Sequence, residues 1–229
     1  RSFSLNALWK SKVAVLVGDY LLAKGLLAAV SYKEYHLLEI VSDAVREMSE
    51  GELLQIQKSR RNGIAPEEYF EIIRKKTAAL ISSCTACGAY SAGASEESIE
   101  RMKQFGEHAG IIFQIKDDLL DYQKTGLTGK PTGNDIREGK YTLPLILALQ
   151  HSPAGEAREI RRMMRRKDLK KKDVNKVIEF AGRYGGISQA TEKMNEYIKT
   201  ALLLLEDFPA NEAREALSDL LYFIASREN

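Results

Sequence analysis

The sequence predicts an all-α protein, and three observations support this fold class. Apolar residues recur at helical spacing along the whole chain, and no stretch alternates apolar and polar residues as a strand would. Short segments rich in glycine, proline, serine and asparagine separate the periodic stretches. The composition, with 44% hydrophobic and 29% charged residues, is typical of a chain that buries a core. Because its 229 residues contain no linker or repeat, we expect one helical domain over residues 1–229.

Helical spacing predicts helices at residues 6–30, 34–60, 66–90, 96–124, 142–151, 156–167, 171–183, 187–206 and 211–226. Breaks between them are predicted at Arg60–Gly63, Ser91–Ser95, Ser152–Gly155, Gly185–Gly186 and Phe208–Pro209. The third helix has a clear start, because Pro66 suits a first turn and the acidic Glu67 and Glu68 stabilise the positive end of the helix dipole.

The first predicted helix contains the most apolar stretch of the chain, Val13–Val30, which is just long enough to span a membrane. It also carries Asp19 and Lys24. We therefore interpret it as a buried helix of a protein that does not span a membrane, and we expect Asp19 to have a hydrogen-bond partner. The start of the chain shows no signal-peptide pattern.

Two cysteines, Cys84 and Cys87, form a C-x-x-C pattern within a run of small residues that suits close helix packing. A zinc site would need two further ligands, and the histidines are scattered along the chain (His36, His108 and His151). We interpret both cysteines as buried small hydrophobic residues of a protein from a reducing compartment, which favours the cytoplasm.

The formal net charge of +2 is too small to indicate nucleic acid or a membrane surface as a partner. Basic residues do cluster between Arg158 and Lys172, but Met163, Met164 and Leu169 are interspersed among them. This pattern favours a solvated helical hairpin over a surface for an anionic partner.

A long segment without helical spacing, residues 125–142, combines glycines with charged side chains (Gly126, Gly129, Lys130, Gly133, Asp135, Arg137, Gly139 and Lys140). Glycines let backbone amides approach an anion and lysines neutralise it, so the segment is a candidate phosphate-binding loop. A flexible surface loop is the alternative that this segment alone leaves open.

Two helices carry polar residues where their spacing predicts core. In the helix from Pro66, Lys76 interrupts an apolar stripe made of Tyr69, Ile72, Ile73 and Leu80. Lys76 either reaches the surface along its apolar stem or binds an anion in a cavity, whereas we expect Lys75 to be solvated and paired with Glu71. The stripe of the helix at 34–60 ends in Glu52 and Gln55, which either line a cavity or reflect ordinary drift near a helix end.

The strongest pattern lies in the predicted helix 96–124, where four polar residues share one face at spacings of three and four (Gln114, Asp117, Asp118 and Asp121). Apolar residues surround them, and crowded carboxylates repel one another, so a hard divalent cation would stabilise the arrangement. Oxygen ligands without nearby histidine or cysteine favour Mg²⁺, especially with substrate phosphates as further ligands. An exposed acidic face beside a loop is the simpler alternative.

Together these features suit Mg²⁺–diphosphate chemistry in a helical cavity, and the sequence lacks a Walker loop or a dinucleotide fingerprint. Several motifs resemble those of the trans-isoprenyl diphosphate synthase family. Residues 113–121, Phe-Gln-Ile-Lys-Asp-Asp-Leu-Leu-Asp, resemble its second aspartate-rich motif, and Gly129–Pro144 resembles the loop that follows. Further resemblances are Lys76-Thr77-Ala78 to its K-T-A, Glu50–Gln55 to E-G-E-x-x-Q, Ala14–Asp19 to A-V-L-x-G-D, and the segments Tyr184–Ile187 and Ala216–Arg227.

The resemblance covers nearly the whole chain and implies an isoprenoid-synthase-type helical bundle around a central cavity. It implies a prenyltransferase that condenses isopentenyl diphosphate with an allylic diphosphate into a longer trans-polyprenyl diphosphate, with Mg²⁺ as cofactor and a homodimer as assembly. The allylic diphosphate ionises, and the isopentenyl double bond attacks the resulting cation in a site that excludes water.

By resemblance, Asp117 and Asp121 hold Mg²⁺, with Asp118 supporting them. The side chains that grip the allylic diphosphate are Lys76, Lys130 and Lys140. Thr77 and Gln114 shield the cation and orient the substrate, and further substrate-binding residues are Gln55 and Arg1.

The chain departs from the family pattern because the first aspartate-rich motif, D-D-x-x-D, is absent. By resemblance that motif precedes Arg1, so we expect the longer protein to be active and residues 1–229 alone to be inactive. Product length is not predicted, because the family sets it largely through side chains just before that motif.

Three other functions remain open from the sequence. A terpene cyclase shares the helical bundle, but Lys76-Thr77 and the glycine–lysine loop favour chain elongation. A non-catalytic subunit of a heteromeric prenyl diphosphate synthase would gain nothing from the intact acidic face. A helical interaction module would show no Mg²⁺-dependent diphosphate binding.

Overall fold

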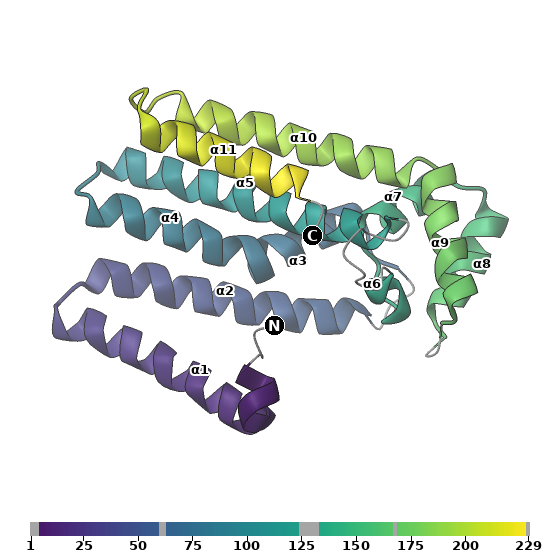
Figure 1. Ribbon diagram of the computed structural model, residues 1–229, viewed down its shortest axis with the longest axis horizontal. Coiled ribbons are helices and arrows are strands. Elements are labelled where there is room, and N and C mark those ends of the chain that lie inside the picture. Colours follow the sequence, from purple (N-terminus) through teal and green to yellow (C-terminus); the bar gives the residue numbers. More distant parts are fainter. Residues whose placement is uncertain (1–4, 60–62, 124–132, 167–168, 228–229) are drawn as a thin grey trace. The chain divides into compact units, whose positions relative to one another are not determined.

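The computed structural model describes residues 5–59, 63–123, 133–166 and 169–227, and over these ranges the chain forms helices and turns without any strand (Figure 1). The helices are α1 (Leu5–Ser31), α2 (Tyr35–Ser59), α3 (Pro66–Ile73), the π-helix η1 (Arg74–Ala78), α4 (Ala79–Ser91), α5 (Glu96–Asp121), α6 (Asn134–Arg137), α7 (Leu143–His151), α8 (Ala154–Met164), α9 (Lys171–Arg183), α10 (Gly186–Leu205) and α11 (Glu212–Ser226). The predicted all-α class is confirmed, and α6 and η1 are the elements that the sequence pattern did not predict.

The chain divides into two compact units, Arg1–Asp43 and Ala44–Asn229, and the boundary falls inside α2. In the first unit, α1 ends in a turn at Lys33, whose positive φ of 59° lies in the left-handed region. The amide of Glu34 closes this turn by donating to the carbonyl of Ala29 over 2.9 Å. The expectation of a single domain stays a prediction.

The helix α1 is not buried as expected. Asp19 and most other side chains of α1 from Lys12 on are exposed, so the prediction of a buried helix is wrong. The physical reason is that, within the first unit, only the start of α2 is available to cover the apolar surface of α1. By length and composition, Lys12–Ser31 could cross a membrane. A single helix of this kind near the start of the chain is weak evidence for a membrane span.

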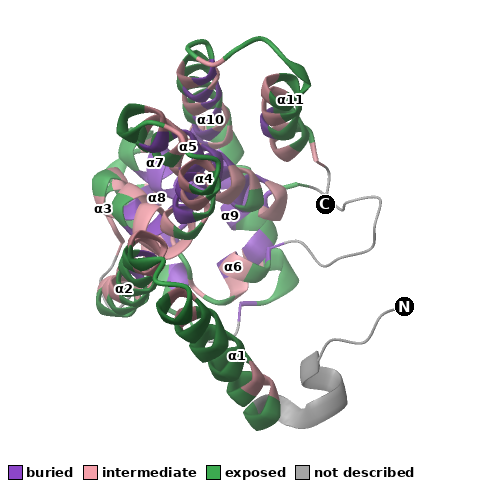
Figure 2. Cartoon of the chain, turned by 90° about the vertical axis from the view of Figure 1, so that its left-hand side faces the viewer, coloured by how far each residue is buried: buried purple, intermediate pink, exposed green. Residues whose placement is uncertain are grey.

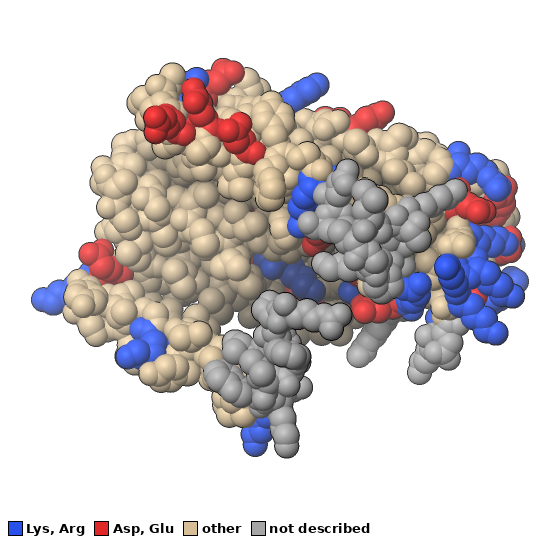
Figure 3. All heavy atoms as spheres, in the orientation of Figure 1, with Lys and Arg blue, Asp and Glu red and all other residues tan. Residues whose placement is uncertain are grey.

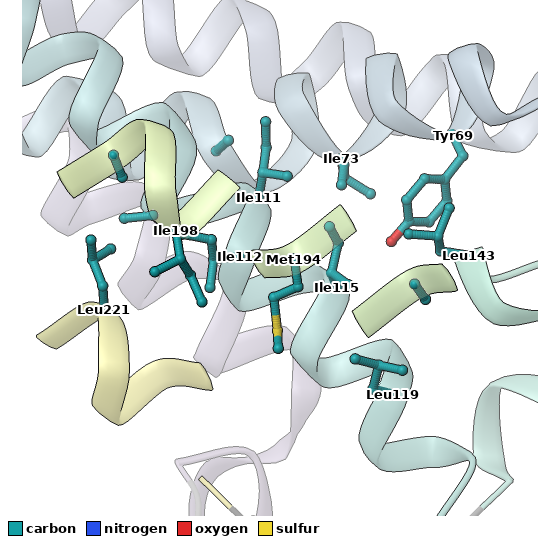
Figure 4. Close-up of a cluster of buried hydrophobic side chains, with 14 of the residues drawn as sticks. Tyr69, Ile73, Ile111, Ile112, Ile115, Leu119, Leu143, Met194, Ile198 and Leu221 are labelled. Carbon is teal, nitrogen blue, oxygen red and sulfur yellow. The ribbon is translucent and has the colours of Figure 1, made fainter. Parts of the chain in front are cut away.

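The core of the second unit consists of two hydrophobic clusters that meet at α7. The first contains buried residues of α3, α5, α10 and α11 (Figure 4), and the second contains residues of α6, α8 and α9. Leu143 and Ile146 of α7 belong to the first cluster, whereas Leu145 and Ala148 belong to the second. A helix that is apolar on all sides, as α7 is, is expected inside a core, whereas α5 and α10 are buried along one side only (Figure 2).

The helices α4 and α5 pack closely through small residues, as the sequence predicts. A Cβ on Gly106 of α5 would lie 2.8 Å from the Cα of Ser82 in α4. The buried face of α4 consists of Ser82, Ser83 and Ala86, which leaves Cys84 exposed and Cys87 half-buried. The prediction that both cysteines are buried is therefore wrong for Cys84.

The basic segment forms the helical hairpin that was predicted. Met163 and Met164 of α8 and Leu169 are buried, while Lys176 of α9 pairs with Glu159 of α8 at 2.5 Å. Figure 3 shows basic side chains gathered over α8 and α9 with acidic ones among them.

The predicted helix 66–90 is interrupted by η1. A π-helical turn holds one residue more than an α-helical turn. The buried positions of α4 are therefore shifted by one residue from the repeat that α3 sets. Ala78 is fully buried, whereas Leu80, which was predicted for the core, is 47% exposed.

Candidate active site

A cavity of about 350 Å³ lies in the second unit, between α2, α3, η1, α5 and the segment that joins α6 to α7. The candidate residues that line it are Gln55, Lys76, Thr77, Gln114, Asp118 and Lys140. Its charged lining comprises the lysines Lys58, Lys76 and Lys140 and the acids Asp118, Asp135 and Glu138. The structure thus brings together candidates that are far apart in the sequence.

Lys76 lies in η1 and faces α2. Its ammonium group lies 2.7 Å from a carboxylate oxygen of Glu52 and donates to the amide oxygen of Gln55 over 2.5 Å. Both Lys76 and Gln55 line the cavity, so the last turns of α2 form part of its wall. Gln55 thus lines a cavity, whereas anion binding by Lys76, whose side chain is 40% exposed, stays a prediction.

The neighbouring Lys75 is not the solvated lysine that the sequence pattern predicts. It donates to a carboxylate oxygen of Glu50 in α2 over 2.7 Å, and its side chain is only 18% exposed. The expected pairing with Glu71 assumed an α-helix, whereas the wide turn of η1 brings both lysines to α2.

Gly51 allows this close approach of α2 to η1. A Cβ at position 51 would lie 2.7 Å from the backbone nitrogen of Lys76 and 2.9 Å from the Cβ of Lys75. Any larger residue would push α2 away from η1, and with it Gln55.

Asp118 of α5 points into the interior, where it is 2% exposed. Its Oδ2 accepts from the hydroxyl of Tyr69 over 2.6 Å and from the backbone amide of Leu143 over 3.2 Å. Its Oδ1 accepts from Nε2 of Gln114 over 3.2 Å, and Oε1 of Gln114 accepts from the hydroxyl of Thr77 over 3.1 Å. Burial raises the pKa of Asp118 from 3.8 to about 7, against the lowering effect of these donors.

The other two aspartates of the motif take different directions. Asp117 is exposed and forms an ion pair with Arg227, whose guanidinium lies 4.1 Å from the ring centre of Phe113. Asp121 accepts from the first amides of α6, from Asn134 over 2.8 Å and from Asp135 over 3.0 Å. The predicted helical face exists, because α5 runs to Asp121, but its carboxylates serve three separate partners.

One wall of the cavity, which we call the loop wall, is formed by α6 and the segment that joins it to α7. It contains Lys140, which lies 2.9 Å from Asp135 and 2.7 Å from Glu138. Burial opposes the charge of Lys140, but the hydrogen bonds to Glu138 and Asp135 outweigh it and raise the pKa of the lysine. Two further candidates, Lys130 and Arg1, lie outside the described residues.

Mg²⁺ fits part of this acidic face. Asp117 and Asp121 are oxygen donors four residues apart, and the carboxylate of Asp117 is 46% exposed. Within the described ranges, however, no three acidic, histidine or cysteine side chains gather around one point. Asp117 and Asp121 therefore offer donor atoms that suit a hard cation, and its remaining ligands would have to come from elsewhere.

Sequence reasoning missed Tyr69, Lys58 and Arg227. Tyr69 was placed correctly in the core (Figure 4), but a buried tyrosine in place of phenylalanine also signals a hydrogen-bond partner. Lys58 lines the cavity and pairs with Glu68, and it lies three residues beyond Gln55 on the same helix face. No local signal links Arg227 to Asp117, because they are 110 residues apart.

Comparisons with known proteins identify the family of the chain. A family model described as polyprenyl synthetase matches residues 2–181. The short chain isoprenyl diphosphate synthase of Methanothermobacter thermautotrophicus is 33% identical over 99% of this chain and 70% of its own length. The octaprenyl diphosphate synthase of Escherichia coli is 31% identical over 97% of this chain and 69% of its own length.

Solved structures give the same result. A polyprenyl synthase from Caulobacter crescentus, complexed with calcium and isoprenyl diphosphate, is 36% identical with a TM-score of 0.89 over 98% of this chain and 69% of that one. A geranylgeranyl pyrophosphate synthase from Bacteroides thetaiotaomicron is 38% identical with a TM-score of 0.86 over 96% of this chain and 73% of that one. The chain therefore belongs to the polyprenyl synthetase family, the prenyltransferases that make trans-polyprenyl diphosphates.

Proposed function

We propose that the cavity binds an allylic diphosphate and that the protein joins it head to tail to isopentenyl diphosphate. The observation that carries this proposal is the convergence of Lys76, Thr77, Gln114 and Lys140 on one cavity of about 350 Å³. The lysines present ammonium groups that can bind a diphosphate, and Thr77 and Gln114 present neutral oxygen atoms beside them. This combination is suited to ionising an allylic diphosphate and stabilising the resulting allylic cation.

Lys76 and Lys140 bind the diphosphate by exchanging partners. Each lysine already contacts two oxygen acceptors from protein side chains. A diphosphate offers oxygen atoms of the same kind with more negative charge, so it competes well for both ammonium groups. Gln55 lies beside Lys76 and completes this side of the site, and Lys130 and Arg1 belong to the same proposal through the family resemblance.

Asp117 and Asp121 would hold Mg²⁺, with Asp118 supporting them from the interior. When bound, Mg²⁺ supplies charge neutralisation for the departing diphosphate. The calcium in the Caulobacter crescentus complex is a hard cation of the same class. Asp117 must then release Arg227, which the exposed position of that carboxylate permits.

The chain's own residues then protect the reactive cation. Thr77 and Gln114 present oxygen atoms at the cavity wall, and the apolar side chains of Ile72 and Ile73 line the same cavity and exclude water. We also propose a cytoplasmic homodimer, on the basis of family resemblance and the free cysteines.

Product analysis with labelled isopentenyl diphosphate, an allylic diphosphate and Mg²⁺ tests this function. From the longer protein that contains the first aspartate-rich motif we expect labelled linear polyprenyl diphosphates, and Asp117→Ala in that protein should remove most of the turnover because the diphosphate loses a metal ligand. Glu159→Ala, which removes a surface carboxylate paired with Lys176, is the matched control and should leave turnover unchanged. Near-normal turnover of Asp117→Ala would refute the metal assignment, and unlabelled cyclic hydrocarbons would indicate a cyclase instead.

A further inference from the structure

Asp118 is the one acidic side chain within the described ranges that is buried, although it stands in the middle of an aspartate-rich motif. Tyr69, Leu143 and Gln114 donate hydrogen bonds to its two oxygens. Mg²⁺ gives up its bound waters reluctantly and usually keeps several of them. Asp118 lines the cavity but is only 2% exposed, and protein donors already occupy both of its oxygens, so it has little surface to offer such a hydrated ion.

The hydrogen bonds around Asp118 have one direction. Nε2 of Gln114 donates to Oδ1 of Asp118, so Oε1 of the same amide faces Thr77. The hydroxyl of Thr77 must then donate to Gln114. The lone pairs of the Thr77 oxygen are therefore free to accept or to face a positive charge. In this series of hydrogen bonds from Thr77 through Gln114, every donated proton points toward Asp118, and hydrogen bonds linked in this way polarise one another. The oxygen atoms at the cavity end are therefore suited to a positively charged neighbour.

We propose that Asp118 and Tyr69 are positioning residues that hold Gln114 and Thr77 in this orientation toward the substrate cation, and that Asp118 does not bind the metal directly. This inference rests on the proposed function, since the cation arises only in prenyl transfer. Tyr69 reaches Asp118 from α3, with its hydroxyl directed into the interior beside Leu143 (Figure 4). Asp118 thus links α3, α5 and the start of α7 at one point.

The Asp118→Asn substitution separates positioning from metal binding. Asparagine presents one oxygen and one amide, so either Tyr69 and Leu143 or Gln114 must face a donor instead of an acceptor. If Gln114 flips, Thr77 has to accept, and the lone pairs that faced the cavity are lost. We expect kcat to fall roughly ten- to hundredfold, while the Mg²⁺ concentration for half-maximal activity stays unchanged. Asp117→Asn is the reference and should raise that Mg²⁺ concentration.

Tyr69→Phe tests the second residue without disturbing the core, because the ring remains. We expect kcat to fall about tenfold, with unchanged KM for both substrates. The matched control is Tyr184→Phe, because the hydroxyl of Tyr184 also donates to a carboxylate over 2.6 Å, that of Glu156, and neither residue lines the cavity. Equal kcat in these two variants would overturn the role of Tyr69. An Asp118→Asn variant that needs as much Mg²⁺ as Asp117→Asn would overturn the role of Asp118.

A readout that needs no turnover keeps this test separate from the proposed function. The side-chain amide protons of Gln114, assigned by NMR through their loss in Gln114→Glu, should shift and exchange faster in Tyr69→Phe but not in Tyr184→Phe. Unchanged Gln114 signals in Tyr69→Phe would refute positioning even if the protein makes prenyl diphosphates. Absence of any prenyl product from the longer wild-type protein, which contains the first aspartate-rich motif, would refute the proposed function, whatever the Gln114 signals show.

Discussion

The cavity has two walls that are held together in different ways. The helical wall depends on hydrogen bonds between distant residues, such as Lys76 with Gln55 and Thr77 with Gln114. The loop wall depends on short-range contacts, with Lys140 bonded to Asp135 only five residues away. A carboxylate of α5, that of Asp121, joins the loop wall to the rest through the first turn of α6. The helical wall therefore depends on the packing of the whole unit, whereas α6 in the loop wall depends on the cap by Asp121, and Thr142 and Leu143 bond to Tyr122 and Asp118.

The largest effect should come from breaking the helical wall at Gly51. In Gly51→Ala the added methyl group would clash with the backbone of Lys76, so α2 and η1 must separate. We expect the free energy of unfolding to fall by about 2 kcal/mol, as overpacking of a close helix contact does, and the KM for the allylic diphosphate to rise. Denaturant unfolding and steady-state kinetics measure these changes. Gly88→Ala is the control, because a Cβ there meets nothing within 4 Å, and it should stabilise the protein slightly.

A smaller and local effect should follow from removing the cap of α6. In Asp121→Ala the amides of Asn134 and Asp135 lose their acceptor, which typically costs about 1 kcal/mol. Hydrogen exchange should accelerate at α6 while α4 and α5 keep their protection, and Asp121→Asn should restore part of the protection. Faster exchange throughout the second unit would show that the loop wall is not held locally.

The smallest effect should distinguish the two adjacent lysines of η1. Lys75→Met removes only the ion pair with Glu50, whose carboxylate is 41% exposed, so stability should fall by less than about 1 kcal/mol and turnover should hardly change. Lys76→Met should instead raise the KM for the allylic diphosphate, because the cavity loses a cation. Equal effects of both substitutions on KM would mean that η1 does not separate their roles.

Much of the fold was predictable because most helices follow a regular repeat. The boundaries of α2, α7, α9 and α11 lie within a residue of those predicted from spacing and breaks. Periodicity cannot reveal an inserted residue, so η1 went unnoticed and Leu80 was placed in the core wrongly. It also cannot show which apolar stripe finds a partner, so the exposure of α1 was not foreseen.

The candidate site was predictable as a set of residues but not as a set of contacts. Lys76, Thr77, Gln114 and Asp118 do meet at one cavity, as their helical faces and motifs suggested. The different partners of Asp117, Asp118 and Asp121 were beyond sequence reasoning, because Arg227, Tyr69 and α6 reach them through tertiary packing. Residues on one helical face point to the same side of the helix, but how deeply each of them is buried decides which partner it binds.

The wide turn at Arg74–Ala78 also constrains how this protein tolerates changes in length. Because this turn holds one residue more than an α-helical turn, deleting one residue there would restore a regular α-helix without rotating α4 relative to α3. Ala78 and Ser82 would then stay in the grooves that Gly110 and Gly106 provide, whereas Lys75 and Lys76 would no longer both face α2. A one-residue deletion at this position should therefore keep most of the packing of α4 and instead remove the contact of one lysine with α2.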